Sequence, residues 1–173
     1  GGMKGALAGL CEEAEEAVRS RYNIIILSDR QAGPERIPIP ALLATAAVHH
    51  HLIRKGYRGQ IGLIVEAGDV WEVHHFACLI GFGATAINPY LALSTIRDMK
   101  LNNRMQTDLD VEQLKKNYIK AVNDGLLKVF SNVFSAKPAT MARRCFAAIS
   151  DNRLVTGPCA GVARSESFSA APY

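Results

Sequence analysis

Polar side chains that could take part in chemistry follow three separate apolar runs of the chain. Ser28, Asp29 and Arg30 follow the first run, Glu66 ends the second, and Asn88 follows the third. In parallel α/β proteins, the loops after the strands form the edge at which ligands bind and chemistry occurs. These five residues are therefore our candidates for a binding site or an interface.

The same residues also have possible local roles. Asn88 followed by Pro89 is typical of a helix start, because Asn caps free N–H groups and Pro fits the first helical position. Asp29 is able to form an ion pair with Arg30 or with Arg36 in its own loop. A structural interpretation thus stands beside the ligand-binding one.

Five histidines in two groups raise the question of a metal site: His49, His50, His51, His74 and His75. Successive residues on a helix point about 100° apart, so the triplet cannot converge on one ion. His50 and His74 are able to meet across two helices, but no carboxylate or thiolate stands at ligand spacing beside them. We predict no metal site and interpret the histidines as packing and hydrogen-bonding residues.

The cysteines and the glycines form no motif with a known chemistry. Cys11, Cys78, Cys145 and Cys159 are widely spaced, without a Cys-x-x-Cys pair or a ferredoxin-type run, so we expect reduced thiols. The sequence also lacks Gly-x-Ser-x-Gly, a Walker loop and Gly-x-Gly-x-x-Gly. We therefore predict no catalytic residue.

The elements that position these residues alternate in character along the chain. Continuous apolar runs, typical of strands in parallel sheets, are Asn23–Leu27, Ile61–Val65 and Ala84–Ile87. Segments with helical spacing of apolar residues are 4–20, 41–54, 69–80, 88–100 and 110–130. Strand–helix alternation at this spacing predicts consecutive βαβ units, and hence an α/β fold with a parallel sheet. Three strands alone leave open whether the sheet closes into a barrel.

Two capping signals predict where helices begin. Asp69 with Glu72 has the spacing of a capping box for the third helix. Asp110 with Gln113 predicts the start of a long helix after a polar linker. Beyond Asn132 the chain has no sustained period, so we expect an irregular tail.

Composition narrows the classes of function. The chain of 173 residues is 49% hydrophobic and carries a formal charge of +4. Residues 1–132 hold 15 basic and 14 acidic side chains, while residues 133–173 hold five and two, without a basic stripe or interleaved aromatic residues. We therefore predict no nucleic-acid binding. No apolar run approaches the roughly 20 residues that span a bilayer, and the start is no signal peptide. We expect a cytoplasmic protein without membrane contact.

Long motifs occur in order over about residues 7–132. The most specific are Glu72–Ala77 and Gly81–Ala92, and the others are Ile26–Arg30, Pro38–Ala44, Ala47–Ile53, Val65–Gly68, Lys116–Ala121 and Asp124–Ser131. Together they resemble the large subunits of glutamate synthases, in the central domain and the lead-in to the flavin domain.

The resemblance implies a specific setting. Such enzymes hydrolyse glutamine in an amidotransferase domain and pass the ammonia internally to an FMN-bearing barrel that aminates 2-oxoglutarate. An iron–sulfur cluster and an NADPH-linked small subunit or ferredoxin supply electrons. The central domain is a TIM-barrel-like element without its own cofactor, which links the two active sites and helps enclose the ammonia path. On this resemblance, the histidines belong to packing and the chain is inactive alone.

The resemblance also implies a domain division. Residues 1–108 correspond to the later part of the central domain, and residues 109–132 to a helix that leads into the FMN-binding domain. Residues 133–173 depart from the family pattern. We interpret them as a tail that is frame-shifted or disordered. Met141–Phe146 can be encoded in such a way that another reading frame gives a family-like sequence, and the coding DNA tests this hypothesis.

Two other hypotheses remain. The chain is alternatively a stand-alone α/β module that binds a small molecule through Asp29, Arg30, Glu66 and Asn88. The third hypothesis is a histidine-dependent metal protein. Saturable binding of FMN, 2-oxoglutarate or zinc to the chain would favour one of these over a structural segment.

Overall fold

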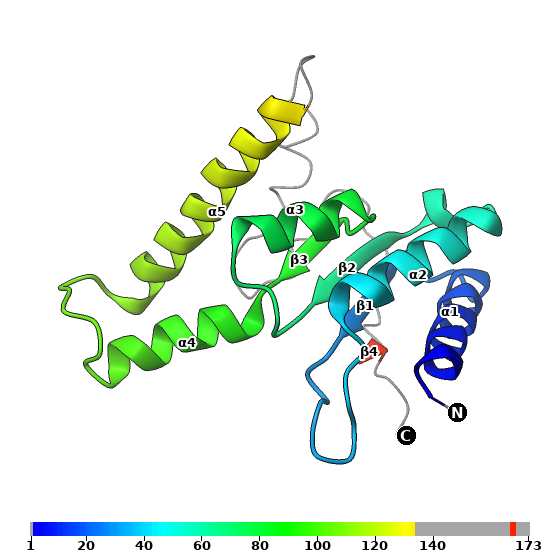
Figure 1. Ribbon diagram of the computed structural model, residues 1–173, viewed down its shortest axis with the longest axis horizontal. Helices are drawn as coiled ribbons and strands as arrows, with labels where there is room; N and C mark the ends of the chain where they lie inside the picture. Colours follow the sequence, from blue (N-terminus) through cyan, green and yellow to red (C-terminus); the bar gives the residue numbers. More distant parts are fainter. Residues whose placement is uncertain (1, 134–166, 169–173) are drawn as a thin grey trace.

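The fold is an α/β arrangement of parallel strands and connecting helices (Figure 1). We obtained it as a computed structural model, which describes residues 2–133 and 167–168. The helices are α1 (Met3–Arg19), α2 (Ala41–Arg54), α3 (Val73–Gly81), α4 (Tyr90–Leu101), α5 (Val111–Val133) and a short 3-10 turn, η1 (Arg58–Gln60). The strands are β1 (Ile24–Ser28), β2 (Gly62–Glu66), β3 (Ala86–Asn88) and β4 (Ser167–Phe168).

The sheet is entirely parallel and has the strand order β3-β2-β1-β4. β2 lies between β1 and β3, and the two-residue β4 pairs with the outer edge of β1. The three strands predicted from apolar runs are confirmed, with starts one or two residues later than expected. The two βαβ units are confirmed as well.

The connecting helices cover one face of the sheet. Side chains alternate between the faces of a strand, and every second residue is buried: Ile25, Leu27, Leu63, Val65 and Ile87. These residues form two apolar cores with α1, α2, α3 and α5. The opposite face is only half-buried. The described strands form an open sheet, and no barrel is seen in this part of the chain.

Helices α1 and α2 pack side by side on that core (Figure 1). Leu10, Ala14 and Val18 of α1 are buried at helical spacing, as the amphipathic pattern predicts. On α2, Val48 and Leu52 are fully buried. The predicted bounds of α2 are confirmed.

The start of α3 differs from the prediction. Glu72, rather than Asp69, is the N-terminal cap, and it forms a capping box with His75. The His75 ring nitrogen Nδ1 accepts the backbone N–H of Glu72 at 3.4 Å and that of Trp71 at 3.1 Å. The predicted Asp69–Glu72 box is therefore wrong, because the helix begins one turn later.

The start of α4 also differs. Asn88 is the last residue of β3, Pro89 is the N-cap residue, and no side chain caps this helix. The predicted Asn88–Pro89 cap is therefore wrong, since the Asn88 amide is used elsewhere. By contrast, the Asp110 cap is confirmed, because its Oδ1 accepts the N–H of Gln113 at 2.7 Å.

Helix α5 closes the second core. Leu114, Val122 and Leu126 are buried on its inner face, which packs against α3 and α4. The Tyr118 hydroxyl donates to the Trp71 carbonyl at 3.0 Å, and burial raises the pKa of Tyr118 to about 12. α5 is thus attached to this domain along its length.

Two predictions from the sequence concern the surroundings of the fold. Within the described residues, no helix is long and apolar enough to cross a membrane. The predicted tail, residues 133–173, lies largely outside the described residues, apart from Val133 and β4.

Candidate functional site

The ends of three neighbouring strands form a row on the half-buried face of the sheet. The register pairs Ser28 of β1 with Glu66 of β2, and Glu66 with Asn88 of β3. Because the strands are parallel and in register, their side chains project from the same face. The topology therefore places three of the five candidate residues side by side.

Glu66 is the centre of this row. Its Oε2 accepts the Ser28 hydroxyl at 2.7 Å, and its Oε1 accepts the Asn88 amide at 3.0 Å. The Arg30 Nε lies 2.8 Å from Oε1 and neutralises the carboxylate. The Glu66 side chain is 19% exposed, so this partly buried charge is balanced by one cation and two further donors. We call Ser28, Arg30, Glu66 and Asn88 the Glu66 cluster.

Asp29 points away from the Glu66 cluster. Its Oδ2 accepts the backbone N–H of Gly68 at 2.8 Å, which ties the loop after β1 to the loop after β2. Its Oδ1 is buried and has no hydrogen-bond partner in the described part of the chain. The predicted pairing of Asp29 with Arg30 is not found, because Arg30 pairs with Glu66. Arg36, the other proposed partner, donates to Gln31.

Tyr90, the first residue of α4, completes the edge. The Arg30 guanidinium carbon lies 4.2 Å from the centre of the Tyr90 ring, a cation–π arrangement. Burial raises the pKa of Tyr90, and the nearby negative charge of Asp29 contributes. A side chain at Gly68 would lie 3.0 Å from the Tyr90 hydroxyl, so this close approach favours glycine. Sequence reasoning missed Tyr90, although its place directly after a strand end was the available signal.

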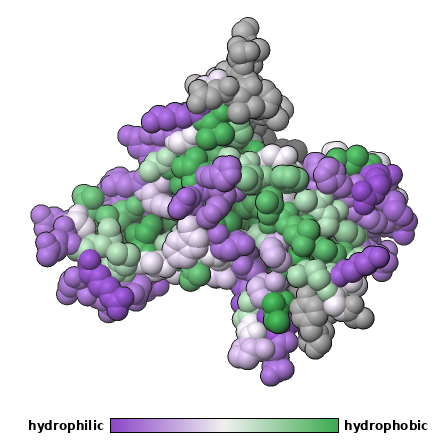
Figure 2. Space-filling model, viewed as in Figure 1, coloured by the Kyte–Doolittle hydropathy of each residue, from purple (hydrophilic) through white to green (hydrophobic). Residues whose placement is uncertain are grey.

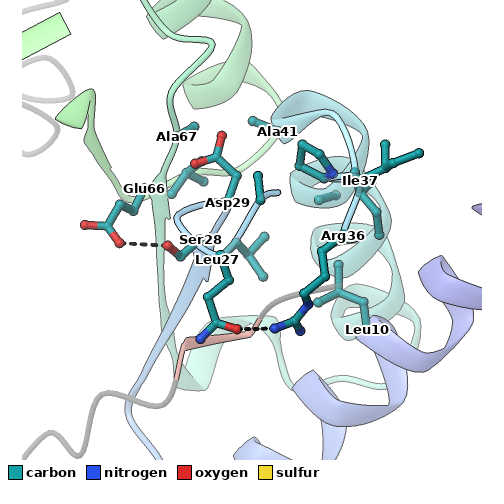
Figure 3. Close-up of a pocket in the computed structure, with 15 residues that line it drawn as sticks. Leu10, Leu27, Ser28, Asp29, Arg36, Ile37, Ala41, Glu66 and Ala67 are labelled. Carbon is teal, nitrogen blue, oxygen red and sulfur yellow. Dashed lines mark hydrogen bonds between the residues drawn. The ribbon is translucent and has the colours of Figure 1, made fainter. Parts of the chain in front are cut away.

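A cavity of about 50 Å³ lies between the end of β1 and the loop that leads to α2 (Figure 3). Ser28, Asp29 and Glu66 contribute polar atoms to its wall, and the remaining wall is mostly apolar, including Leu10 and Ile37. Such a volume has room for a few water molecules. Asp29, whose Oδ1 is buried without a hydrogen-bond partner among the described residues, thus contributes to the wall of this cavity.

The histidines are distributed among different neighbours. His49 Nδ1 accepts from Arg58 Nε at 2.9 Å, while His51 Nε2 lies 2.8 Å from the buried Glu15. His74 Nε2 lies 3.5 Å from the Cys78 sulfur. Within the described residues, no three His, Cys, Asp or Glu side chains come together as a metal site would require.

Arg58 forms the second polar centre, at the opposite edge of the sheet. Its guanidinium donates to the carbonyl oxygens of Ile61 at 2.9 Å and Gly83 at 2.6 Å, besides His49. The His49 pKa is lowered by burial, then by the Arg58 charge and by His50. Sequence reasoning missed Arg58, because nothing in its short loop distinguishes it from a solvent-exposed arginine.

Glu15 anchors α1 to α2. Its carboxylate lies 2.8 Å from His51 Nε2, 3.2 Å from Lys55 Nζ and 2.5 Å from an Arg19 nitrogen. The hydrogen bond to His51 is the main cause of its lowered pKa, and Lys55 and Arg19 contribute. The helices are thus joined by polar contacts to the buried Glu15 carboxylate, whose partners Arg19 and Lys55 are about half exposed.

The geometry defines a class of protein built from consecutive βα units, whose strand-end side chains bind one another. More specifically, residues 1–134 match the family model of the glutamate synthase central domain, and the chain belongs to this family.

Curated relatives agree with this assignment. The chain is 47% identical over 143 residues to ferredoxin-dependent glutamate synthase 2, chloroplastic, of Arabidopsis thaliana. It is 42% identical over 131 residues to the glutamate synthase [NADPH] large chain of Bacillus subtilis, and 39% identical over 132 residues to glutamate synthase [NADH] of Schizosaccharomyces pombe. These alignments cover 76–77% of this chain but only 9%, 8% and 6% of the three relatives.

Proposed function

We propose that this chain is a structural segment of a larger glutamate synthase, which forms glutamate from glutamine, 2-oxoglutarate and a reductant. The observation that carries the proposal is that the side chains of the Glu66 cluster bind one another. Three of its side chains bind Glu66 directly, and its charge is neutralised from within. Such an arrangement holds strand ends in place and leaves the segment without catalysis of its own.

Within the parent enzyme, the segment links the amidotransferase domain to the FMN domain and helps enclose the ammonia path. The FMN, the iron–sulfur cluster and the binding site for the reductant belong to other domains. Relatives named for ferredoxin, NADPH and NADH match this segment at 47%, 42% and 39% identity. This narrow spread supports a role that does not depend on the reductant.

The residues of this segment do not fit an iron–sulfur cluster. Cys11 is buried on α1, and Cys78 lies on α3 in contact with His74. The described residues offer no group of ligands in which these thiols could take part. We therefore assign no electron-transfer step to this segment.

We further propose that the open sheet is part of a TIM-barrel-like domain. In a (βα)₈ barrel, all helices lie outside, and the inner face of the sheet is packed by side chains. The half-buried row of Ile24, Ile26 and Ile64 has this character, because these apolar residues face away from the helices. Further strands of the parent would cover them.

The proposed domain division is 1–108 for the central domain, 109–132 for the helix toward the FMN domain and 133–173 for a frame-shifted or disordered tail. The family match ends at residue 134, close to the proposed start of the tail. The coding DNA tests the frame shift: a second frame that restores family sequence supports it, and its absence refutes it. We place the parent in the cytoplasm, with no membrane or nucleic-acid partner.

The test is a chimera of the Bacillus subtilis relative, in which residues 1–134 replace the matching segment. We expect glutamine- and 2-oxoglutarate-dependent oxidation of NADPH to persist, because the segment supplies structure that the relatives share. An assembled chimera that lacks this activity would refute the proposed function. The unmodified relative is the control.

A stand-alone binding module is the second candidate, favoured by the cavity that Ser28, Asp29 and Glu66 help to line. Titration of the 173-residue chain with FMN, 2-oxoglutarate and zinc separates the candidates. Saturable binding that Asp29→Asn abolishes would support the module, and the structural proposal expects no such binding.

A further inference from the structure

β1 is an apolar strand without charge, and one of its two edges faces away from β2. The strand reads Ile-Ile-Ile-Leu-Ser, with no Asp, Glu, Lys, Arg or Pro. Short segments of this composition have a high tendency to pair with strands of other molecules, and an uncovered edge offers them unpaired N–H and C=O groups. We call the edge of β1 that faces away from β2 the outer β1 edge.

The main-chain groups at the outer β1 edge belong to every second residue of the strand. Just beyond β1, the Asp29 N–H donates to the Glu66 carbonyl at 3.2 Å, so odd-numbered residues direct their main-chain groups to β2. Successive residues of a strand direct these groups to opposite edges. The N–H and C=O groups of Ile24, Ile26 and Ser28 therefore point to the outer β1 edge.

β4 occupies the middle of this edge. It runs parallel to β1, with Ser167 opposite Ile26 and Phe168 opposite Leu27 (Figure 1). These two residues lie beyond the family match, which ends at residue 134. Strand pairing uses main-chain groups and therefore does not require a family sequence. A segment outside the family pattern is thus able to cover the outer β1 edge.

The opposite edge of the sheet is built differently. β3 has only three residues, Ala86–Asn88, and Pro89 follows directly. A short strand and a proline are two ways in which natural sheets block an edge, and charged side chains are a third. Figure 2 shows hydrophilic surfaces at the two sides of the molecule and hydrophobic residues between them, where the sheet and its helices lie. The outer β1 edge is therefore the edge that needs a covering strand.

We propose that the outer β1 edge is a strand-binding surface, and that β4 occupies it and shields it from β1 of a second copy of the chain. The two strands compete because they need the same main-chain groups of β1. β4 competes at the effective concentration set by its connection to the rest of the chain, whereas a second copy competes at its concentration in solution. The inference concerns the 173-residue chain and does not depend on the proposed function.

Proline substitutions at the two positions of β4 test the proposal. The register directs the Phe168 N–H toward β1 and the Ser167 N–H away from it. Phe168→Pro removes the inward donor, so we expect the 173-residue variant to self-associate at about tenfold lower concentration in sedimentation velocity. Ser167→Pro is the matched control, because an edge strand tolerates proline where the N–H faces solvent. Phe168→Ala, which keeps the N–H, is the second control.

Amide hydrogen exchange in dilute, monomeric protein shows where the substitution acts. The Ile26 N–H points to the outer β1 edge, so Phe168→Pro should make it exchange about tenfold faster. The Leu27 N–H points to β2 and should keep its protection, which shows that the sheet is still folded. Both amides should exchange as in the parent chain when Ser167 is changed to proline.

Several results would overturn the proposal. If Phe168→Pro stays monomeric and leaves the Ile26 amide protected, β4 does not shield the edge. If it self-associates with unchanged Ile26 protection, the contact lies on another surface. Equal behaviour of Phe168→Pro and either control would exclude main-chain pairing of β4 as the cause. If Phe168→Pro instead separates a defined dimer into monomers, β4 joins two copies and does not keep them apart.

Discussion

At the scale of single residues, the polar side chains at the strand ends act through one another. Glu66 holds the ends of β1 and β3 through Ser28 and Asn88, and Arg30 supplies the charge that makes its partial burial tolerable. Removing any one partner leaves a hydrogen-bonding group of another residue unsatisfied, which lowers the free energy of unfolding. The contribution of each residue is therefore best measured by changes that keep its shape.

Replacing Glu66 with Gln tests this point. The amide keeps the size of the side chain but loses the attraction to Arg30, so we expect a loss of about 1–2 kcal/mol in the free energy of unfolding. Urea denaturation measures it. The control is Glu112→Gln, which breaks the exposed ion pair with Lys115 and should change stability by less than about 0.5 kcal/mol. Equal effects of the two changes would contradict a special role for Glu66.

Gly83 provides a second test at this scale. Its φ is +106°, a backbone conformation that residues with a Cβ rarely adopt, and an added Cβ would overlap the His49 ring. We expect Gly83→Ala to lower the free energy of unfolding by about 2–4 kcal/mol. Gly9→Ala is the matched control, because Gly9 lies within α1 with open space around its Cα, and alanine there should stabilise by up to about 1 kcal/mol.

At the scale of elements, Arg58 joins segments from three parts of the chain. It binds His49 of α2, the carbonyl at Ile61 before β2 and the carbonyl of Gly83 after α3. This connection requires a His49 Nδ1 without a proton, since Arg58 only donates. The arrangement at this edge of the sheet is therefore sensitive to pH.

The sign of the pH effect follows from the lowered pKa of His49. In the unfolded chain, His49 takes up a proton near pH 6.5, while burial, Arg58 and His50 keep its folded-state pKa below that value. Stability should thus be complete above about pH 6.5 and fall as the pH drops toward the folded-state pKa. His49→Gln should flatten this dependence, measured by urea midpoints at several pH values. His74→Gln, at an exposed position on α3 and not among the groups that lower the His49 pKa, should keep it.

The sequence predicted the strands and helices more accurately than the hydrogen-bond partners of the side chains. The apolar runs gave the strands, because a strand covered by helices needs a continuous hydrophobic surface. Four of the five candidate residues meet in the Glu66 cluster at one edge of the parallel sheet, and Asp29 points away from it. Their partners could not be predicted, because Asn88 has both a cap role and a strand role in its local sequence, and only the register with Glu66 decides between them. The Glu72–His75 box likewise depends on where α3 begins.

At the scale of the whole molecule, the described sheet has one buried and one half-buried face. Neighbouring residues of β2 illustrate this difference, since Leu63 is fully buried under the helices and Ile64 is only half-buried on the other side. In the proposed TIM-barrel-like domain, further strands would cover Ile64, and both would be core positions. The loss of stability when each side chain is shortened to alanine therefore measures how well the surrounding protein covers that face of the sheet.

Alanine substitutions at these two positions give the prediction. In the 173-residue chain, Leu63→Ala should cost about 2–5 kcal/mol of unfolding free energy, and Ile64→Ala much less, because its cavity is open to solvent. In the chimera the two costs should become similar. A difference that persists there, seen in the thermal midpoints of the two variants, would contradict closure of the sheet by further strands.

The row of Ser28, Glu66 and Asn88 has a consequence for how the segment tolerates change in length. The three residues are register partners on adjacent strands, so their contacts depend on the register of the sheet. Loops between the units are free to lengthen without disturbing that alignment. A single residue inserted inside β2, however, would turn Glu66 to the helix side and exchange the inner and outer surfaces of the strand. Insertions and deletions should therefore accumulate between the strands and spare their interiors.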